Sequence, residues 1–204
     1  MAASMDGRVG VLVSGSGTNL QALLDDPSVG PHVVLVVADR PKIAALDRAE
    51  RAGVTPVVIE PADHATRQAF DVAVAAALAG AGVDVLVSAG WMRLLGRPVL
   101  DRYEGRWLNV HPALLPSFTG MHGIADALAY GVKVTGVTVH LVDDGTDTGP
   151  VVAQEAVPVR AGDDHDSLAE RVHAVEHRLL PLAVRALREG RLVVDGRTVS
   201  IREG

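Results

Sequence analysis

An amide and an imidazole at the end of one hydrophobic run are the side chains in this sequence best suited to catalysis. Asn109 and His111 close the run Trp107-Leu108-Asn109-Val110, and Pro112 stops the strand that this run predicts. Side chains two residues apart on a strand face the same side. An amide donates hydrogen bonds, and an imidazole carries protons near neutral pH. Taken alone, the pair is more typical of a histidine hydrogen-bonded in a turn before proline.

A carboxylate in a later loop changes this interpretation. Asp147 lies in the loop of residues 143–150, which also follows a predicted strand, and the glycines on either side of it would let it approach His111. A carboxylate beside an imidazole stabilises the protonated ring. We therefore expect His111 to donate a proton to a leaving group or oxyanion while Asn109 donates a second hydrogen bond.

A glycine-rich loop, Ser14-Gly15-Ser16-Gly17-Thr18-Asn19, joins the first predicted strand to the first predicted helix. Glycines let a backbone approach an anion, and a helix N-terminus presents free N–H groups to it. A phosphate site and a tight turn that needs glycine both fit this pattern, and Thr18 or Asn19 would also suit a helix cap. A dinucleotide fits less well than a monophosphate. Leu20 stands where a third glycine is needed, although Asp39 lies about where a ribose-binding acid would.

Other groups lie where a ligand would reach them, but each also has a simpler interpretation. The stretch Gly90-Trp91-Met92-Arg93-Leu94-Leu95 follows the fourth predicted strand, at the edge where open α/β sheets bind ligands. An apolar loop with one arginine suits a flat heterocycle with an anionic tail, and it equally suits closure of the core. The simpler interpretation is a solvated residue for Arg67, Asp143 and Asp144, and a polar helix face for Glu176-His177.

The elements that must position these residues alternate along the chain. Strands are predicted at Arg8–Ser14, His32–Ala38, Thr55–Ile59, Val83–Ser88, Arg106–Val110, Val134–Val142 and Val151–Val159. Helices are predicted at Thr18–Asp25, Ile43–Ala52, His64–Ala79, Gly123–Tyr130 and Asp166–Glu189, the last interrupted or bent near Pro181. A hairpin, Leu192–Val194 and Arg197–Ile201, turns at Asp195-Gly196. This order predicts a doubly wound, Rossmann-like α/β fold with a mostly parallel sheet.

Composition narrows the class of protein. The 204 residues are 48% hydrophobic, carry a formal net charge of -6 and include no cysteine. We expect one domain over residues 1–204, with a phosphate-binding half at 1–105 and a catalytic half at 106–204. An acidic chain argues against a nucleic-acid-coating surface, and the absence of cysteine excludes disulfides and thiolate zinc sites. No run suits a membrane span and residues 1–6 do not resemble a signal peptide, so we expect a soluble, cytoplasmic protein.

The histidines do not have the spacing of a metal site. His140 lies within a predicted strand, and we expect it to be buried and hydrogen-bonded. No GxSxG elbow is present either, since Gly15-Ser16-Gly17 lacks the pattern.

Together these segments resemble the glycinamide ribonucleotide transformylase family of purine biosynthesis, in order and over nearly the whole chain. The matching segments are Val11–Gln21, Gly90–Leu95, Asn109–Pro116, Gly136–His140, Asp147–Val151 and Glu176-His177. The Asn-x-His pattern with a later Asp is shared by a wider formyltransferase-like superfamily. The Ser-Gly-x-Gly-Thr-Asn loop is narrower and points to a ribonucleotide.

The resemblance implies formyl transfer from 10-formyltetrahydrofolate to the amine of glycinamide ribonucleotide, without a metal. It implies that His111 is the general acid, that Asp147 tunes it and that Asn109 fixes the formyl oxygen. It assigns ribonucleotide binding to Gly17, Thr18, Asn19 and Glu176. It assigns folate binding to Arg67, Met92, Arg93, Leu94, Leu95, Asn109, Asp143 and Asp144. For the assembly, a monomer and a homodimer both remain open.

One departure and two alternatives accompany this resemblance. Thr119 stands where the family often has a proline, so contacts from the loop at 117–123 are not predicted. A methionyl-tRNA formyltransferase or a formyltetrahydrofolate hydrolase would be expected to carry an extra domain, for which the chain has no room. A non-catalytic nucleotide-binding module would not need Asn109, His111 and Asp147 to converge.

Overall fold

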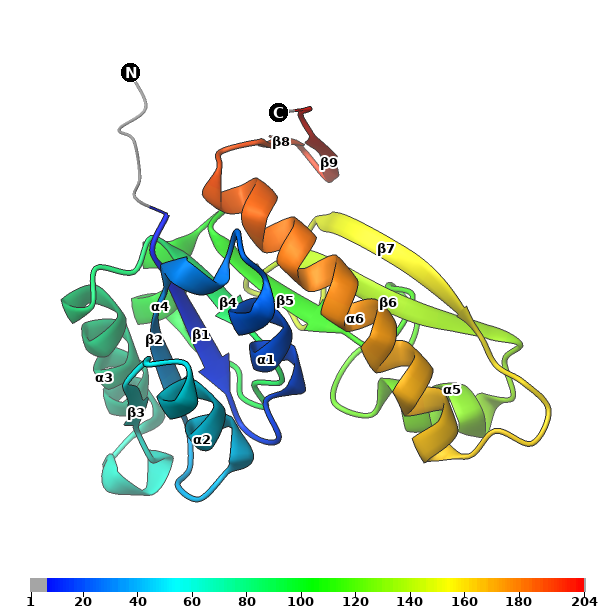
Figure 1. Ribbon diagram of the computed structural model, residues 1–204, viewed down its shortest axis with the longest axis horizontal. Coiled ribbons are helices and arrows are strands. Elements are labelled where there is room, and N and C mark those ends of the chain that lie inside the picture. Colours follow the sequence, from blue (N-terminus) through cyan, green and yellow to red (C-terminus); the bar gives the residue numbers. More distant parts are fainter. Residues whose placement is uncertain (1–6, 204) are drawn as a thin grey trace.

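A single sheet of nine strands runs through the computed structural model, which describes residues 7–203 (Figure 1). The strand order is β3-β2-β1-β4-β5-β6-β7-β9-β8. The strands are β1 (Val9–Val13), β2 (Val33–Ala38), β3 (Pro56–Val58), β4 (Val85–Ser88), β5 (Trp107–His111), β6 (Val134–Leu141), β7 (Val151–Pro158), β8 (Leu192–Asp195) and β9 (Thr198–Ile201). β1 to β5 pair in parallel, whereas β6 is antiparallel to both β5 and β7. The predicted mostly parallel α/β fold is therefore confirmed.

Helices cover both faces of the sheet, which explains why its first strands are apolar on both sides. The helices are α1 (Thr18–Asp25), α2 (Ala44–Arg51), α3 (Arg67–Gly80), α4 (Arg97–Tyr103), α5 (Gly123–Tyr130) and α6 (His165–Arg188), with 3-10 turns at Gly30–His32 and Pro61–Asp63. Val11 and Val13 of β1 pack in one core with α1, α2 and α6, while Leu12 packs in a second core with α3 and α4. This alternation is the period-2 geometry of a strand.

Local chemistry accounts for where several elements differ from their predicted bounds. α3 begins at Arg67 and not at His64, because the Thr66 side chain caps the helix by accepting from the Ala69 N–H at 3.1 Å. α4 was not predicted. It is one short helix with Pro98 in its first turn, where the missing N–H costs nothing.

The C-terminal helix and hairpin are present, with two corrections. The predicted interruption of α6 is wrong, because the helix continues through Pro181, whose side chain is buried against the core. Burial of the ring offsets the hydrogen bond that a proline inside a helix removes. The hairpin turn lies one residue later than predicted, since Asp195 pairs with Thr198 and leaves Gly196 and Arg197 as the turn. Gly196 has φ 57°, which suits glycine.

None of the helices within residues 7–203 combines the length and the apolar character that a bilayer crossing requires.

Candidate functional site

The three residues expected to act together converge at the end of β5. The His111 Nδ1 lies 3.5 Å from one carboxylate oxygen of Asp147, and the Asn109 Nδ2 lies 3.4 Å from the other. β5 supplies the amide and the imidazole on one face, and the loop that follows β6 supplies the carboxylate. The arrangement can hold a protonated imidazole and an amide donor beside one reacting group.

The loop that carries Asp147 is folded by its own side chains. The Asp143 carboxylate accepts hydrogen bonds from the Gly145 N–H at 3.1 Å and from the Thr148 hydroxyl at 2.7 Å. A Cβ at Gly149 would lie 1.7 Å from the Leu141 carbonyl oxygen, so this position requires glycine. The exposed Asp144 lies 3.4 Å from the Arg97 guanidinium. Asp143 therefore shapes the loop, and Asp144 lies at its surface.

A second loop covers the imidazole. The His111 Nε2 lies 2.7 Å from the Phe118 carbonyl oxygen, and the Gly120 N–H donates to Asp147 at 2.8 Å. Because a carbonyl only accepts, Nε2 carries the proton in this arrangement. These contacts leave His111 only 3% exposed. A substrate atom that receives the Nε2 proton must therefore replace the Phe118 carbonyl.

His140 adds a second imidazole to the site. It is buried and hydrogen-bonded, as expected, and lies opposite Asn109 in the β5–β6 pair. Its Nδ1 donates to the Leu141 carbonyl at 2.8 Å, so in the neutral ring Nε2 accepts from the Asn109 amide at 3.1 Å. His140 thereby orients Asn109. The pairing register that places these two residues opposite each other is not visible in the sequence.

Asp147 is held in its ionised form. Burial alone would raise the pKa of this carboxyl, but the neighbouring His140 and His111 imidazoles and a hydrogen bond from the Gly120 backbone bring the pKa below its usual 3.8. A carboxylate with a lowered pKa stabilises the fold above its unfolded pKa, and this contribution is lost as the pH falls through the lower, folded value.

This shift gives a test of Asp147 that does not depend on activity. We expect Asp147→Asn to have a lower melting temperature than the unchanged protein at pH 7. This difference should shrink as the pH falls below about 4, because the Asp147 carboxylate becomes protonated there whereas the amide of the variant does not titrate. Turnover should fall roughly 10-fold to 100-fold, the scale for disturbing a positioned acid. Thermal melts at pH 3 to 7 check the first expectation. A difference in melting temperature that does not vary with pH would contradict it.

The glycine-rich loop meets the N-terminus of α1 without a capping side chain. Gly17 is the N-cap residue with φ 71°, and no side chain in the described part of the chain caps the helix, so a cap by Thr18 or Asn19 is not found. The first N–H groups of the helix are consequently available to an anion. A Cβ added at Gly15 would meet no atom within 4 Å, whereas one at Gly17 would lie 2.7 Å from the Ala45 Cβ. Open space thus lies over Gly15, and Gly17 packs on α2.

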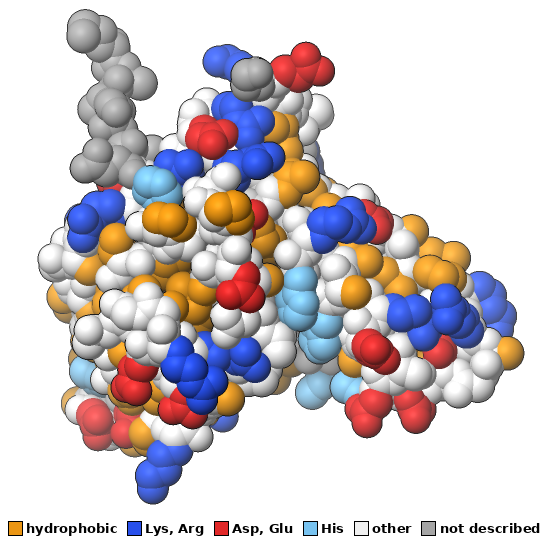
Figure 2. Space-filling model, in the orientation of Figure 1, with side chains coloured by type: hydrophobic (Ala, Val, Ile, Leu, Met, Phe, Trp, Pro, Cys, Tyr) orange, Lys and Arg blue, Asp and Glu red, His pale blue; other side chains and the backbone are white. Residues whose placement is uncertain are grey.

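Asn19 and Glu176, predicted from distant parts of the sequence, lie in contact. The Asn19 Nδ2 donates to the Glu176 carboxylate at 2.9 Å, and the His173 Nδ1 lies 2.8 Å from the same oxygen. This hydrogen bond raises the pKa of His173 above its usual 6.5. Histidine side chains gather on this face where α1 meets α6 (Figure 2). Glu176 is 3% exposed, so it is a buried, partnered carboxylate and not part of a solvated helix face.

One cation beside the glycine-rich loop was missed in the sequence. The Arg48 Nε donates to the Ser16 carbonyl at 2.9 Å, and its Nη1 donates to the Gln21 side chain at 3.1 Å. In the sequence, Arg48 fits the helical pattern only as a polar position of α2, so the pattern does not indicate this contact.

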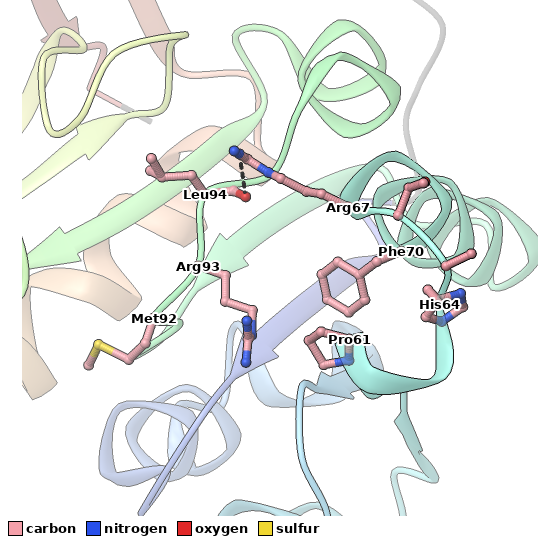
Figure 3. Close-up of a pocket in the computed structure, with 9 residues that line it drawn as sticks. Pro61, His64, Arg67, Phe70, Met92, Arg93 and Leu94 are labelled. Atoms are coloured by element: carbon pink, nitrogen blue, oxygen red, sulfur yellow. Dashed lines mark hydrogen bonds between the residues drawn. The ribbon is translucent and has the colours of Figure 1, made fainter.

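A separate cavity of about 520 Å³ lies beside the loop that follows β4 (Figure 3). Its lining includes Arg67, Met92, Arg93 and Leu94, whereas Leu95 is buried and does not line it. The Arg67 guanidinium donates to the Leu94 carbonyl at 2.8 Å. A dashed line marks this hydrogen bond in Figure 3. None of the three residues at the end of β5 and in the Asp147 loop lines this cavity. Within residues 7–203, no three His, Cys, Asp or Glu side chains are grouped so as to hold a metal ion.

Comparison with known proteins identifies the class of protein to which this fold and this convergence of amide, imidazole and carboxylate belong. Residues 7–184 match the formyl transferase family, so the chain belongs to that family. It is 52% identical over 201 residues to the phosphoribosylglycinamide formyltransferase of Mycobacterium tuberculosis (strain CDC 1551 / Oshkosh), covering 97% of this chain and 93% of that protein.

Two further comparisons agree with membership of this family. The fold is similar to the crystal structure of glycinamide ribonucleotide transformylase 1 from Symbiobacterium toebii, with a TM-score of 0.93 and 48% identity over 96% of this chain and 94% of that chain. The chain is also 42% identical over 186 residues to the human trifunctional purine biosynthetic protein adenosine-3, covering 90% of this chain and 18% of that protein.

Proposed function

We propose that this protein is a phosphoribosylglycinamide formyltransferase of purine biosynthesis. It transfers a formyl group from 10-formyltetrahydrofolate to the amine of glycinamide ribonucleotide, giving formylglycinamide ribonucleotide and tetrahydrofolate. The observation that carries the proposal is the convergence of Asn109, His111 and Asp147 within 3.5 Å in a member of the formyl transferase family. A nucleotide-binding module without activity would have no need of this arrangement.

The three residues have complementary roles in the reaction. The substrate amine attacks the formyl carbon, a carbon–nitrogen bond forms, and the carbonyl electron pair moves to the oxygen. The Asn109 amide donates to that oxyanion. The attacking amine then loses a proton to water, and the oxyanion electron pair re-forms the carbonyl as the bond to the folate nitrogen breaks. That nitrogen takes a proton from the His111 imidazolium, which Asp147 stabilises.

The ribonucleotide subsite lies at the glycine-rich loop. Gly17, Thr18 and Asn19 hold the phosphate at the uncapped start of α1, and Glu176 contacts the ribonucleotide. The open space over Gly15 and the hydrogen bond between Asn19 and Glu176 support this assignment. The Asp39 carboxylate is bound by Arg40 and Arg93, so it does not offer the free acid that a dinucleotide ribose would need.

The folate subsite uses the loop after β4 and the Asp147 loop. The residues assigned to it are Arg67, Met92, Arg93, Leu94, Leu95, Asn109, Asp143 and Asp144. The exposed apolar side chains of Met92 and Leu94 support contact with a flat ring. Arg93 contributes through its backbone, because Asp39 holds its guanidinium at 2.6 Å. Asp143 contributes by shaping the loop.

The remaining assignments concern the setting of the enzyme. We place the boundary between a ribonucleotide half and a catalytic half near residue 105, and we place the protein in the cytoplasm as a monomer or homodimer that needs no metal. The cysteine-free sequence suits a reducing compartment.

An acceptor competition tests the proposed activity. The purified protein receives limiting radiolabelled formyl-folate together with glycinamide ribonucleotide and methionyl-tRNA. We expect label on the ribonucleotide only, because a tRNA needs a broad basic surface and this chain carries a net charge of -6. On the face shown in Figure 2, basic and acidic side chains are interspersed. Label mainly on the tRNA would overturn the choice of acceptor, and no transfer with either acceptor would overturn the activity.

A further inference from the structure

The glycine-rich loop and the loop after β4 are hydrogen-bonded to each other at their first residues. The Ser14 N–H donates to the Gly90 carbonyl at 3.2 Å, and the Ser14 hydroxyl oxygen accepts from the Met92 N–H at 3.1 Å. Ser14 is 6% exposed, so water does not readily replace these bonds. β1 and β4 are adjacent in the sheet, and these contacts extend their pairing into the two loops.

A buried carboxylate makes a second connection between the same two loops. Asp39, at the end of β2, has a side chain with no exposed area, and the Arg93 Nε donates to it at 2.6 Å. Arg40 binds the same carboxylate, with its Nε 3.1 Å from Oδ1. Burial would raise the pKa of Asp39, but hydrogen bonds from Arg40 and Arg93, with the Ser14 hydroxyl nearby, hold this pKa below 3.8. Asp39 thus stays ionised beside Ser14 and is hydrogen-bonded to the loop after β4.

Two further contacts fix the rest of the loop after β4. The Arg67 guanidinium donates to the Leu94 carbonyl, and the buried Asp71 carboxylate accepts from the Gly96 N–H at 3.0 Å. Both come from α3 and do not touch the glycine-rich loop. Ser14 and Asp39 are therefore the residues through which the two loops can affect each other.

We propose that Ser14 and Asp39 are positioning residues that join the ribonucleotide loop (Ser14–Asn19) to the folate loop (Met92–Leu95), so that each substrate binds more tightly when the other is present. The inference rests on the proposed function, which puts one substrate at each loop. A ligand that orders one loop orders its hydrogen-bonded partner, so the second ligand meets a smaller loss of conformational entropy. The effect must be reciprocal, because it is a coupling free energy between two binding events.

Calorimetry on the unchanged full chain measures this coupling. The dissociation constant of tetrahydrofolate is determined alone and with saturating glycinamide ribonucleotide, and then the order of the two ligands is reversed. We expect the same enhancement in both orders, about 5-fold or more, which is the lower end of typical coupling. If the dissociation constant of a ligand is the same with and without the other ligand, in either order, the ratio of the two constants is one and the inference is overturned. If neither ligand binds at all, the proposed function fails as well, and this result is distinct from binding without coupling.

Two variants assign the coupling to the named residues. In Asp39→Asn and in Ser14→Ala we expect the ratio to fall towards one, while each ligand alone still binds. Asp166→Asn is the matched control, because the same chemical change is made on a side chain that is 98% exposed at the start of α6, and it should keep the full ratio.

A purely structural role predicts a different result. It would weaken the binding of both ligands and leave the ratio of the dissociation constants unchanged, and that outcome would overturn the inference. If Asp39→Asn does not fold, as shown by circular dichroism, Ser14→Ala carries the test, since it removes one hydroxyl and no charge.

Discussion

Replacing His111 by alanine is expected to lower the turnover of formyl transfer by roughly 100-fold or more, the usual scale for loss of a positioned acid. The folate nitrogen would leave without the proton that we assign to His111, while the proposed ribonucleotide contacts, Asn19 and Glu176, lie elsewhere. The Michaelis constant for the ribonucleotide should therefore change much less than turnover. Steady-state kinetics with each substrate varied in turn provides the measurement.

Two comparison variants separate chemistry from folding in this experiment. His111→Gln should be as inactive as His111→Ala, because an amide can still donate to the Phe118 carbonyl but cannot release a proton near neutral pH. His165→Ala should keep full turnover, since that imidazole is 62% exposed at the start of α6. Turnover within a few-fold of the unchanged protein in His111→Gln would rule out the acid role of His111.

Replacing Gly15 by valine is expected to weaken ribonucleotide binding by about 10-fold or more while the protein stays folded. The estimate corresponds to the loss of one hydrogen bond to a charged group. A Cβ at Gly15 meets no atom of residues 7–203 within 4 Å, so the new side chain fills only the space that we assign to the phosphate. Folate affinity, measured alone by calorimetry, should change little.

Two other glycines serve as controls for this substitution. Gly80→Val makes the same change at the end of α3, again with open space around the Cβ, and should leave ribonucleotide affinity unchanged. Gly17→Val should instead lower the melting temperature, because its φ is 71° and a Cβ there would lie 2.7 Å from the Ala45 Cβ. Equal loss of ribonucleotide and folate affinity in Gly15→Val would indicate misfolding and would contradict the phosphate assignment.

The order and type of the main elements could be predicted because they depend on local patterns. β1 is an unbroken apolar run, and α1 begins where glycines end that run, so both follow from the sequence. The turn between β8 and β9 was predicted one residue too early, because the register of a hairpin depends on which residues pair, here Asp195 with Thr198. α4 escaped prediction because seven residues carry too little periodicity.

The candidate site could be predicted as a set of loops but not as a set of contacts. Parallel strands end at one edge of the sheet, so residues after β1, β4 and β5 are expected near each other. The partners of those residues depend on side-chain packing across the fold. The binding of Arg93 by Asp39 and of Asn109 by His140 therefore appeared only in the structure.

The hydrogen bond between Asn19 and Glu176 has a consequence for how the protein is made. The two residues are 157 positions apart, and α6 is synthesised near the end of translation. A nascent chain that stops before α6 lacks the helix that packs on α1 and the Glu176 carboxylate of the proposed ribonucleotide subsite. Formation of contacts so distant in sequence is slow, because the loop they close is long. We therefore expect the proposed ribonucleotide subsite to be completed at the last stage of co-translational folding, after the strands of the first half have been synthesised.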